Sequence, residues 1–308
     1  MWAFIKLIRP INTLILFLCM YSTRFFYLNL INPSYKSALF ERIDFFLFVF
    51  ATVLILAGGN IINDYFDVKA DQINKPDKVI INKYIKQRFA ILSHWTLNGL
   101  ALGIGIYLSI KSRSFSFLFV FLLAINLLWF YSVRFKRRLW VGNIVVSLLL
   151  ACIPFICLMY FNVFEIHFQS ETKAKELLYL VENNRFIVLF SMFAFFINLL
   201  REIIKDVIDT EGDKKIKAIT LPIFYGINKT KKILIIFFII GIILQIFFVF
   251  WISKEFQFLF NLPFYFILFL KLMCFIFLLI SKWKSCSFLL KTVLIIGILS
   301  PFYWLMIF

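Results

Sequence analysis

The sequence predicts an all-α polytopic membrane protein, a bundle of about nine transmembrane helices. The mean hydropathy of the 308 residues is +0.93 and 63% of them are apolar, which is more than a soluble domain of this length can bury. The apolar residues gather in runs long enough to cross a bilayer. None of these runs has the two-residue alternation of a strand, so a membrane barrel is not expected.

The nine predicted spans follow one another along the chain and are separated by polar segments. They lie near 11–31, 43–63, 91–110, 115–131, 140–162, 185–205, 232–252, 261–281 and 288–308. The first run is long and no small-residue cleavage pattern follows it, so we expect it to stay in the protein. We expect residues 1–308 to form a single transmembrane domain.

Charge predicts how the spans are oriented. The chain carries 33 Lys and Arg against 16 Asp and Glu, a net charge of +17. This excess is also typical of nucleic-acid-binding proteins, but here the basic residues gather on one side of the predicted spans. The positive-inside rule therefore places the N-terminus in the cytoplasm and the C-terminus outside the cell (inner) membrane. Membrane lipids, and no nucleic acid, are the expected surroundings.

Cysteine and histidine give no sign of a metal or haem site. The five cysteines lie in or beside apolar runs and show no C-x-x-C spacing, while the two histidines are far apart in the sequence. We interpret the cysteines as buried structural residues.

Two matched acidic clusters follow the second and sixth predicted spans. They contain Asn60, Asn63, Asp64, Asp67 and Asp71 in the first, and Glu202, Asp206, Asp209 and Asp213 in the second. If each span continues as a helix through its cluster, the acids fall within a stripe about 60° wide, because residues four and seven apart share a helix face. Each stripe then directs several carboxylates to one side.

Such clusters are unstable without a counter-charge, because like charges at neighbouring helix positions repel. Mg²⁺ binds oxygen ligands, commonly one or two carboxylates together with substrate phosphates. The clusters therefore suggest divalent metals that hold a diphosphate on the cytoplasmic side. Two alternatives remain: a solvated helix end, and an ion-coupled transporter whose carboxylates relay ions.

At these motifs the chain resembles the UbiA superfamily of intramembrane prenyltransferases. The segment Asn63–Asp71 fits the N-D-x-x-D-x-x-x-D motif of that family, and Asp209–Asp213 fits its second motif, D-x-x-x-D. Tyr131–Lys136 is similar to a Y-S-x-x-x-K element between spans four and five, and Thr220–Pro222 to the segment after the second motif. Nine spans is also the count of that family.

The resemblance implies Mg²⁺-dependent transfer of a polyprenyl group from its diphosphate to an acceptor, with release of pyrophosphate. The implied metal ligands are Asn63, Asp64, Asp67, Asp71, Asp209 and Asp213. The implied diphosphate contacts are Tyr131, Ser132, Arg134, Lys136, Lys205 and Lys214. These cations are also accounted for by ordinary positive-inside charge.

Glu202 and Asp206 lie deeper along the sixth span than the second motif. We expect one of them to orient or deprotonate the acceptor, as a general base. The structural alternative is an ion pair, such as Glu202 with Lys205 or Asp206 with Arg201. The segments that follow spans two and six, about 64–90 and 206–231, are expected to form a cytoplasmic cap over the site.

The acceptor is expected to be a lipid-soluble or phosphorylated molecule. The run from Arg201 to Pro222 most resembles the geranylgeranylglycerol-phosphate geranylgeranyltransferase branch of the superfamily, and an aromatic quinone precursor is the alternative acceptor. One departure concerns Asn74–Val79, where a lysine, Lys78, stands in place of an arginine of the family pattern. Two cations lie at unusual depth. Lys271 lies within the eighth span, and we expect Arg24 to snorkel to the membrane interface.

Overall fold

The structure is a computed structural model that describes residues 2–27, 39–165, 185–253 and 258–307. The chain divides into two compact units: unit 1 is residues 1–136 with 152–189, and unit 2 is residues 137–151 with 190–308. Over the described residues the secondary structure is helical, apart from an isolated β-bridge between Ile81 and Ile85. The predicted all-α class is confirmed.

Eight helices of the described part are long and apolar enough to cross a membrane. They cover Ile43–Asn74, Gln87–Lys111, Ser116–Val133, Val141–Phe161, Arg185–Ile208, Ile227–Trp251, Leu259–Leu279 and Trp283–Trp304. The first predicted span corresponds to α2 (Pro10–Phe26), which has 17 residues, at the short end of what spans a bilayer. The predicted end of this span, 28–31, lies outside the described residues.

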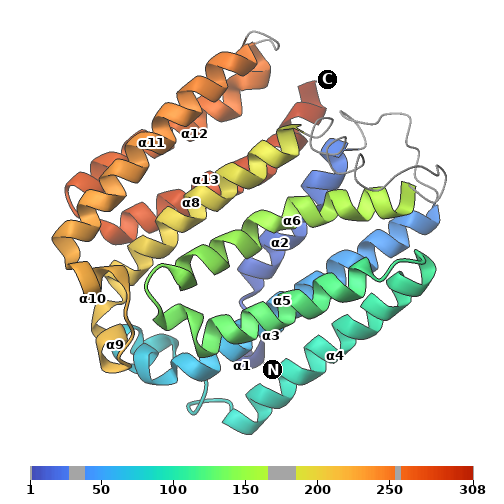
Figure 1. The fold of residues 1–308 in the computed structure, drawn as a ribbon, viewed down its shortest axis with the longest axis horizontal. Coiled ribbons are helices and arrows are strands. Elements are labelled where there is room, and N and C mark those ends of the chain that lie inside the picture. The colour runs from blue at the N-terminus through green and yellow to red at the C-terminus, as the bar shows by residue number, and fades with distance from the viewer. Residues whose placement is uncertain (1, 28–38, 166–184, 254–257, 308) are drawn as a thin grey trace. The chain divides into compact units, whose positions relative to one another are not determined.

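Unit 1 is built around α3 (Leu39–Asn74), a helix of 36 residues (Figure 1). It contacts α1 (Trp2–Leu7), α2, α4 (Gln87–Lys111) and α5 (Ser116–Val133). Its interior is rich in stacked and edge-on aromatic rings. The ring centroid of Phe48 lies 5.2 Å from that of Tyr160 and 5.6 Å from that of Phe117. This apolar packing fixes α3 as the element on which the first motif stands.

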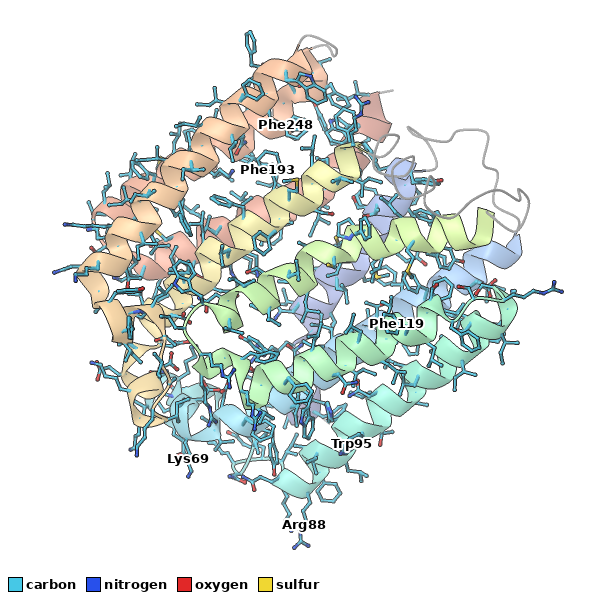
Figure 2. The ribbon with its side chains drawn as sticks, viewed as in Figure 1. Lys69, Arg88, Trp95, Phe119, Phe193 and Phe248 are labelled. Carbon is cyan, nitrogen blue, oxygen red and sulfur yellow. The ribbon has the colours of Figure 1, made fainter. Side chains whose placement is uncertain are left out.

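Unit 2 contains the segment after the second motif and the last three long helices. Its complete helices are α9 (Thr210–Lys215), α10 (Leu221–Tyr225), α11 (Ile227–Ser253), α12 (Phe258–Leu279) and α13 (Trp283–Ile307). Two helices belong partly to each unit, α6 (Val141–Glu165) and α8 (Arg185–Ile208). Phe193 of α8 and Phe248 of α11 point toward one another in Figure 2, with ring centroids 5.2 Å apart.

The two segments expected to cap the site, 64–90 and 206–231, contain helices. In the first, α3 continues to Asn74, and η2 (Pro76–Lys78) lies between it and α4. The helix α3 ends there because Pro76 lacks an amide hydrogen and Lys75 before it leaves the helical conformation, with φ −149° and ψ 60°. The segment 206–231 holds α9 and α10.

Arg24 does not snorkel. Its side chain is buried, and its guanidinium lies 4.7 Å from the ring centroid of Phe45. The guanidinium therefore meets an aromatic face inside unit 1.

Candidate active site

The first motif lies on the last three turns of α3, as the sequence predicts. No glycine or proline interrupts the chain between Gly59 and Pro76, so the helix continues past the apolar run. Asn60, Asp64, Asp67 and Asp71 therefore share one helical stripe.

Asp64 is bound by a cation that the sequence did not single out. The guanidinium of Arg9 donates a hydrogen bond to the Asp64 carboxylate. Arg9 precedes α2 in a left-handed conformation, with φ 55° and ψ 70°, which costs a non-glycine residue about 1–2 kcal/mol. Nearby, the Asn60 side-chain amide donates to the Ile8 carbonyl at 3.1 Å. These two bonds tie the turn between α1 and α2 onto the motif.

Asp67 is the most enclosed acid of the first motif, with 3% of its surface exposed. Its Oδ2 accepts hydrogen bonds from the Asn63 amide, at 2.8 Å, and from the Lys136 ammonium. Lys136 comes from the short helix η3 (Phe135–Arg137) that follows α5. The predicted association of Lys136 with the first motif is thus present in the structure.

The pKa of Arg9 shows how burial and the nearby carboxylates act on the charge of this cluster. Burial alone would lower the pKa of the Arg9 guanidinium, but the carboxylates of Asp64, Asp71 and Asp67 together raise it above its ordinary value. Arg9 therefore stays protonated. Two cations, Arg9 and Lys136, offset the three carboxylates of the stripe.

The second motif is broken where an uninterrupted helical stripe was expected. The helix α8 ends at Ile208, and Asp209 forms the junction with α9. The Thr210 hydroxyl bonds the carbonyl oxygens of Asp206 and Val207, at 2.9 and 3.0 Å, and so satisfies the end of α8. Because the helix is interrupted at Asp209, Asp213 does not continue a single regular stripe from Glu202.

Asp213 nevertheless stays close to the junction. Its amide bonds the Asp209 carbonyl at 3.1 Å, its own carbonyl accepts from the Ala218 amide at 3.0 Å, and the residue is buried. Lys214 next to it is exposed and lies 3.3 Å from the exposed Glu211. The predicted diphosphate contact Lys214 is thus paired at the surface of α9.

The two predicted catalytic acids have different partners. Glu202 lies 2.5 Å from the Lys205 ammonium and 3.2 Å from Arg201, so the ion pair considered as its alternative role is present. Asp206 instead accepts a hydrogen bond from the Asn143 side-chain amide at 2.8 Å. The bond from Asn143 orients the Asp206 carboxylate, which is what a proton-accepting role requires, so we assign that role to Asp206 below.

The remaining predicted diphosphate contacts lie at the end of α5. The Ser132 hydroxyl is buried and donates to the Leu128 carbonyl at 2.9 Å within the helix. Tyr131 is half-buried, and Arg134 is exposed. Lys136 of the Tyr131–Lys136 element bonds the motif acid Asp67.

The residues suit Mg²⁺ in chemistry, although within the described ranges no three His, Cys, Asp or Glu side chains are gathered closely enough to hold a metal ion. The donors of both motifs are carboxylate and amide oxygens, and Mg²⁺ takes one or two carboxylates while phosphate and water complete its shell. Asp67 already accepts an ammonium and an amide, so its position favours positive charge. The ligand set therefore fits a metal that arrives with a diphosphate.

Two side chains that bond motif acids, Arg9 and Asn143, were not among the predicted site residues. Arg9 could have been found from the sequence as a cation directly before Pro10, at the start of the first span. Asn143 lies seven positions after the end of the Tyr131–Lys136 element. Asn60 belongs to the predicted stripe but was not expected to bond the backbone of Ile8. Nothing in the sequence pairs these residues with their partners.

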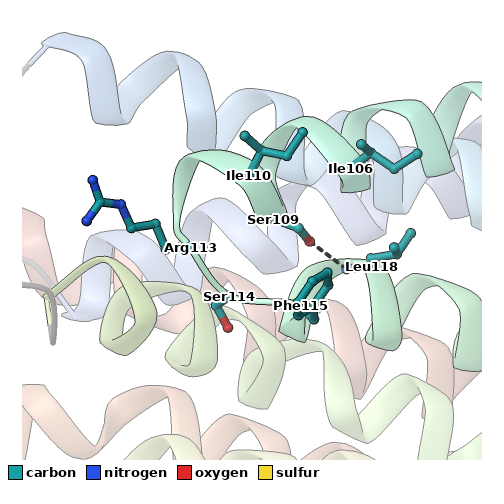
Figure 3. Close-up of a pocket in the computed structure, with 7 residues that line it drawn as sticks. All are labelled: Ile106, Ser109, Ile110, Arg113, Ser114, Phe115 and Leu118. Atoms are coloured by element: carbon teal, nitrogen blue, oxygen red, sulfur yellow. Dashed lines mark hydrogen bonds between the residues drawn. The ribbon is translucent and has the colours of Figure 1, made fainter.

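A surface hollow of about 240 Å³ lies away from both motifs, where α4 meets α5 (Figure 3). Its wall includes Ile106, Ile110 and Phe115, and the Ser109 hydroxyl accepts a hydrogen bond from the Leu118 amide at 3.1 Å. It lies at the end of α4 opposite to the turn that follows α3, so it is not part of the acidic site.

Comparison with known proteins agrees with this geometry. The profile of the UbiA prenyltransferase family matches residues 34–291. The digeranylgeranylglyceryl phosphate synthase of Thermococcus sibiricus is 32% identical over 242 residues, which cover 78% of this chain and 75% of that protein.

Two solved structures show the same fold. A UbiA homolog from Aeropyrum pernix K1 superposes with a TM-score of 0.67 at 14% identity, covering 92% of this chain and 95% of that one. A UbiA homolog from Archaeoglobus fulgidus, bound to GPP and Mg²⁺, gives 0.62 at 20% identity and 99% coverage of both chains. The predictions of a multi-pass membrane protein and of a prenyltransferase are confirmed. This chain belongs to the UbiA prenyltransferase family.

Proposed function

We propose that this prenyltransferase moves a geranylgeranyl group from its diphosphate to the hydroxyl of a geranylgeranylglyceryl phosphate-type acceptor. The acceptor oxygen bonds to C1 of the prenyl chain, the bond from C1 to the diphosphate oxygen breaks, and pyrophosphate leaves with the electron pair. The hydroxyl proton passes to a base of the protein. The acceptor class is supported by the name of the Thermococcus sibiricus relative, and the diphosphate by the ligand of the Archaeoglobus fulgidus homolog.

The observation that carries the reaction is the α3 stripe, whose buried Asp67 is already bonded by Asn63 and Lys136. Mg²⁺, when bound, neutralises the charge of the departing pyrophosphate. Within unit 1, Asn63, Asp64, Asp67 and Asp71 would hold it, and within unit 2 the proposed metal ligands are Asp209 and Asp213.

The cations of the site, which bond carboxylates in this structure, would bond the diphosphate instead. In this structure Arg9 and Lys136 neutralise Asp64 and Asp67, and both cations would be available to the diphosphate if those carboxylates held a metal. Released cations stabilise the negative charge of the leaving group. We therefore add Arg9 to the predicted diphosphate contacts Tyr131, Ser132, Arg134, Lys136, Lys205 and Lys214.

Asp206 is the proposed base, positioned by Asn143, while Glu202 holds Lys205 and Arg201. We further propose that the enzyme lies in the cell membrane, with the N-terminus and both motifs on the cytoplasmic side and the C-terminus outside. A single domain over residues 1–308 remains our prediction.

The test uses purified protein in lipid with labelled geranylgeranyl diphosphate, Mg²⁺ and geranylgeranylglyceryl phosphate. Pyrophosphate release and the new lipid are followed by mass spectrometry. We expect Asp67→Asn and Asp209→Asn each to lower turnover at least about 100-fold, since each removes a metal ligand. Asp77→Asn, at an exposed acid of η2, serves as the control. Turnover that persists in EDTA, or in both motif variants, would contradict the proposal.

A further inference from the structure

Lys271 is a buried cation inside unit 2. It lies on the inward face of α12 and has 3% of its surface exposed. Its neighbours on that face are the buried Phe260, Phe264, Ile267, Cys274 and Leu278. The ammonium has no hydrogen-bond partner among the described residues, and it lies 5.4 Å from the ring centroid of Phe193 on α8.

A ring face is a weak substitute for a counter-ion, because a cation–π contact contributes less than the burial of a charge costs. Ionisable residues inside membrane spans are rare and usually mark a site that binds or transfers something. Among the described residues, Lys271 has no partner of opposite charge.

Two other cations lie at the same depth. Cys274 and Cys286 each direct a thiol at the other's carbonyl oxygen, at 3.5 and 3.2 Å, which fixes the register of the α12–α13 hairpin. In that register Lys271 and Lys291 lie within about 3 Å of one another along the helix axes. Arg201 on α8 lies close enough to Lys291 for their charges to interact.

Arg201 is also incompletely bonded. One of its terminal nitrogens lies 3.2 Å from Glu202, but its buried Nε has no hydrogen-bond partner in the part of the chain that the structure describes. Glu202 is shared with Lys205, so one carboxylate serves two cations. Positive charge from α8, α12 and α13 is thus concentrated at one level of unit 2.

The level of Lys271 lies inward of the end of unit 2 that carries the second motif. Lys231, at the start of α11, donates to the Leu279 carbonyl at 2.6 Å and lies 2.9 Å from the Ser281 hydroxyl. The chain reaches α11 directly from the motif through α9 and α10. Lys271 lies about 12 Å inward of that end, at 1.5 Å per residue.

We propose that unit 2 binds the anionic oxygen group of the acceptor at this level, with Lys271 as its principal contact and Arg201 and Lys291 beside it. The inference rests on the proposed function and names an acceptor-specificity site for it. A phosphate monoester supplies the counter-charge that Lys271 lacks, while Phe193 and Phe248 offer an apolar surface for the attached chain. An aromatic carboxylate has the same chemistry, and the test below separates the two.

The experiment compares Lys271→Met and Lys271→Arg with Lys284→Met, which alters an exposed lysine of α13. Each is assayed with geranylgeranyl diphosphate and one of three acceptors: geranylgeranylglyceryl phosphate, its dephosphorylated alcohol, and a hydroxynaphthoate. We expect Lys271→Met to raise the KM for the phosphorylated acceptor at least tenfold and to leave the KM for geranylgeranyl diphosphate unchanged. Lys271→Arg and Lys284→Met should stay near wild type.

The dephosphorylated alcohol is the decisive control, because it lacks the anion and should be used equally by wild type and Lys271→Met. A KM effect confined to the hydroxynaphthoate would support the site with a carboxylate as its ligand. An unchanged KM for every anionic acceptor, or an equal rise for the alcohol, would overturn the inference.

Folding does not confound this test. Removing an uncompensated buried charge is neutral or stabilising, so Lys271→Met should unfold at the same or a higher temperature. If wild type transfers no prenyl group at all, the proposed function fails. The site is then tested separately, since geranylgeranylglyceryl phosphate should still raise the unfolding temperature of wild type and not of Lys271→Met. An equal rise in both would overturn the site.

Discussion

Two acids of the first motif, Asp64 and Asp67, each have a cationic partner that a metal-bound diphosphate would displace. Asp64 is held by Arg9, and Asp67 by Lys136 and Asn63. Two carboxylates whose surfaces are 17% and 3% exposed would repel strongly without these cations. The cations thus stabilise the metal-free fold, and in the proposed reaction they would contact the diphosphate.

Replacing Lys136 with Met should therefore destabilise the metal-free protein. We expect a loss of about 2 kcal/mol, less than for a fully buried pair, because Lys136 is about a third exposed and its charge is screened. Saturating Mg²⁺ should restore more stability to Lys136→Met than to wild type, since it neutralises the abandoned Asp67. Thermal unfolding with and without Mg²⁺ measures both effects.

Lys69→Met is the matched control, because Lys69 lies on α3 beside the motif and projects outward at the end of unit 1 (Figure 2). Equal stabilisation of Lys136→Met and wild type by Mg²⁺ would show that Asp67 is not a metal ligand.

Asp206→Asn should lower kcat at least about 100-fold, as expected for loss of a general base, with the KM for geranylgeranyl diphosphate unchanged. Asn143→Ala should lower kcat by a smaller factor, because Asn143 only positions the carboxylate. Glu202→Gln serves as the comparison, since Glu202 is engaged by Lys205 and Arg201. Steady-state kinetics measures kcat and KM for each variant. Full turnover in both Asp206→Asn and Glu202→Gln would contradict the proposal that either residue is a general base.

At the scale of the elements, close helix contacts hold α3, α4 and α5 together. Gly58 and Gly59 of α3 bring its backbone against Asn98 of α4 and Leu128 of α5, and His94 of α4 lies 3.0 Å from the Gly58 carbonyl. Small residues at membrane-helix interfaces permit this approach. The helix that carries the first motif is therefore held rigidly from both sides.

Gly105→Ala tests this packing at the neighbouring contact between α4 and α5. A Cβ at Gly105 would lie 2.8 Å from a ring carbon of Phe121, which is 1% exposed and cannot swing away. We expect a loss of about 1–3 kcal/mol from overpacking. Gly103→Ala is the matched control in the same helix, because nothing lies within 4 Å of its added Cβ. Thermal unfolding of both variants in lipid gives the comparison, and equal stability of the two would contradict the packing argument.

The helices α3 and α8 show where the local sequence pattern was enough to predict the extent of a helix and where it was not. The run from Gly59 to Asn74 contains no helix breaker, so the continuation of α3 was predictable from sequence. The end of α8 at Ile208 was not, because no glycine or proline marks it. That boundary depends on the Thr210 hydroxyl, which satisfies the last carbonyls of α8.

At the scale of the whole molecule, each unit gathers basic segments at the end that carries its motif. In unit 1 the ion pairs of Arg9 and Lys136 place the N-terminal turn and the α5–α6 turn at the motif end of α3. In unit 2 Lys231 joins the start of α11 to the α12–α13 turn. This arrangement supports the proposed cytoplasmic position of both motifs.

Cysteine labelling tests that orientation. We expect Arg113→Cys, in the α4–α5 turn, to react with a membrane-impermeant maleimide in intact cells, and Lys83→Cys, in the α3–α4 turn, to react only after permeabilisation. Both original side chains are exposed. The unsubstituted chain, with its five cysteines, sets the background. The opposite labelling pattern would invert the proposed topology.

The sequence by itself determined the class of protein, its spans and the position of both acidic motifs, because run length and helical spacing are local properties of the chain. The tertiary structure decided which cation meets which acid. Arg9 lies 55 residues from Asp64, Lys136 lies 69 from Asp67, and Asn143 lies 63 from Asp206. Such pairs form only when packed helices bring distant segments to the same end of a unit. Packing likewise buries Lys271 with no counter-ion among the residues that the structure describes, which no local pattern could reveal.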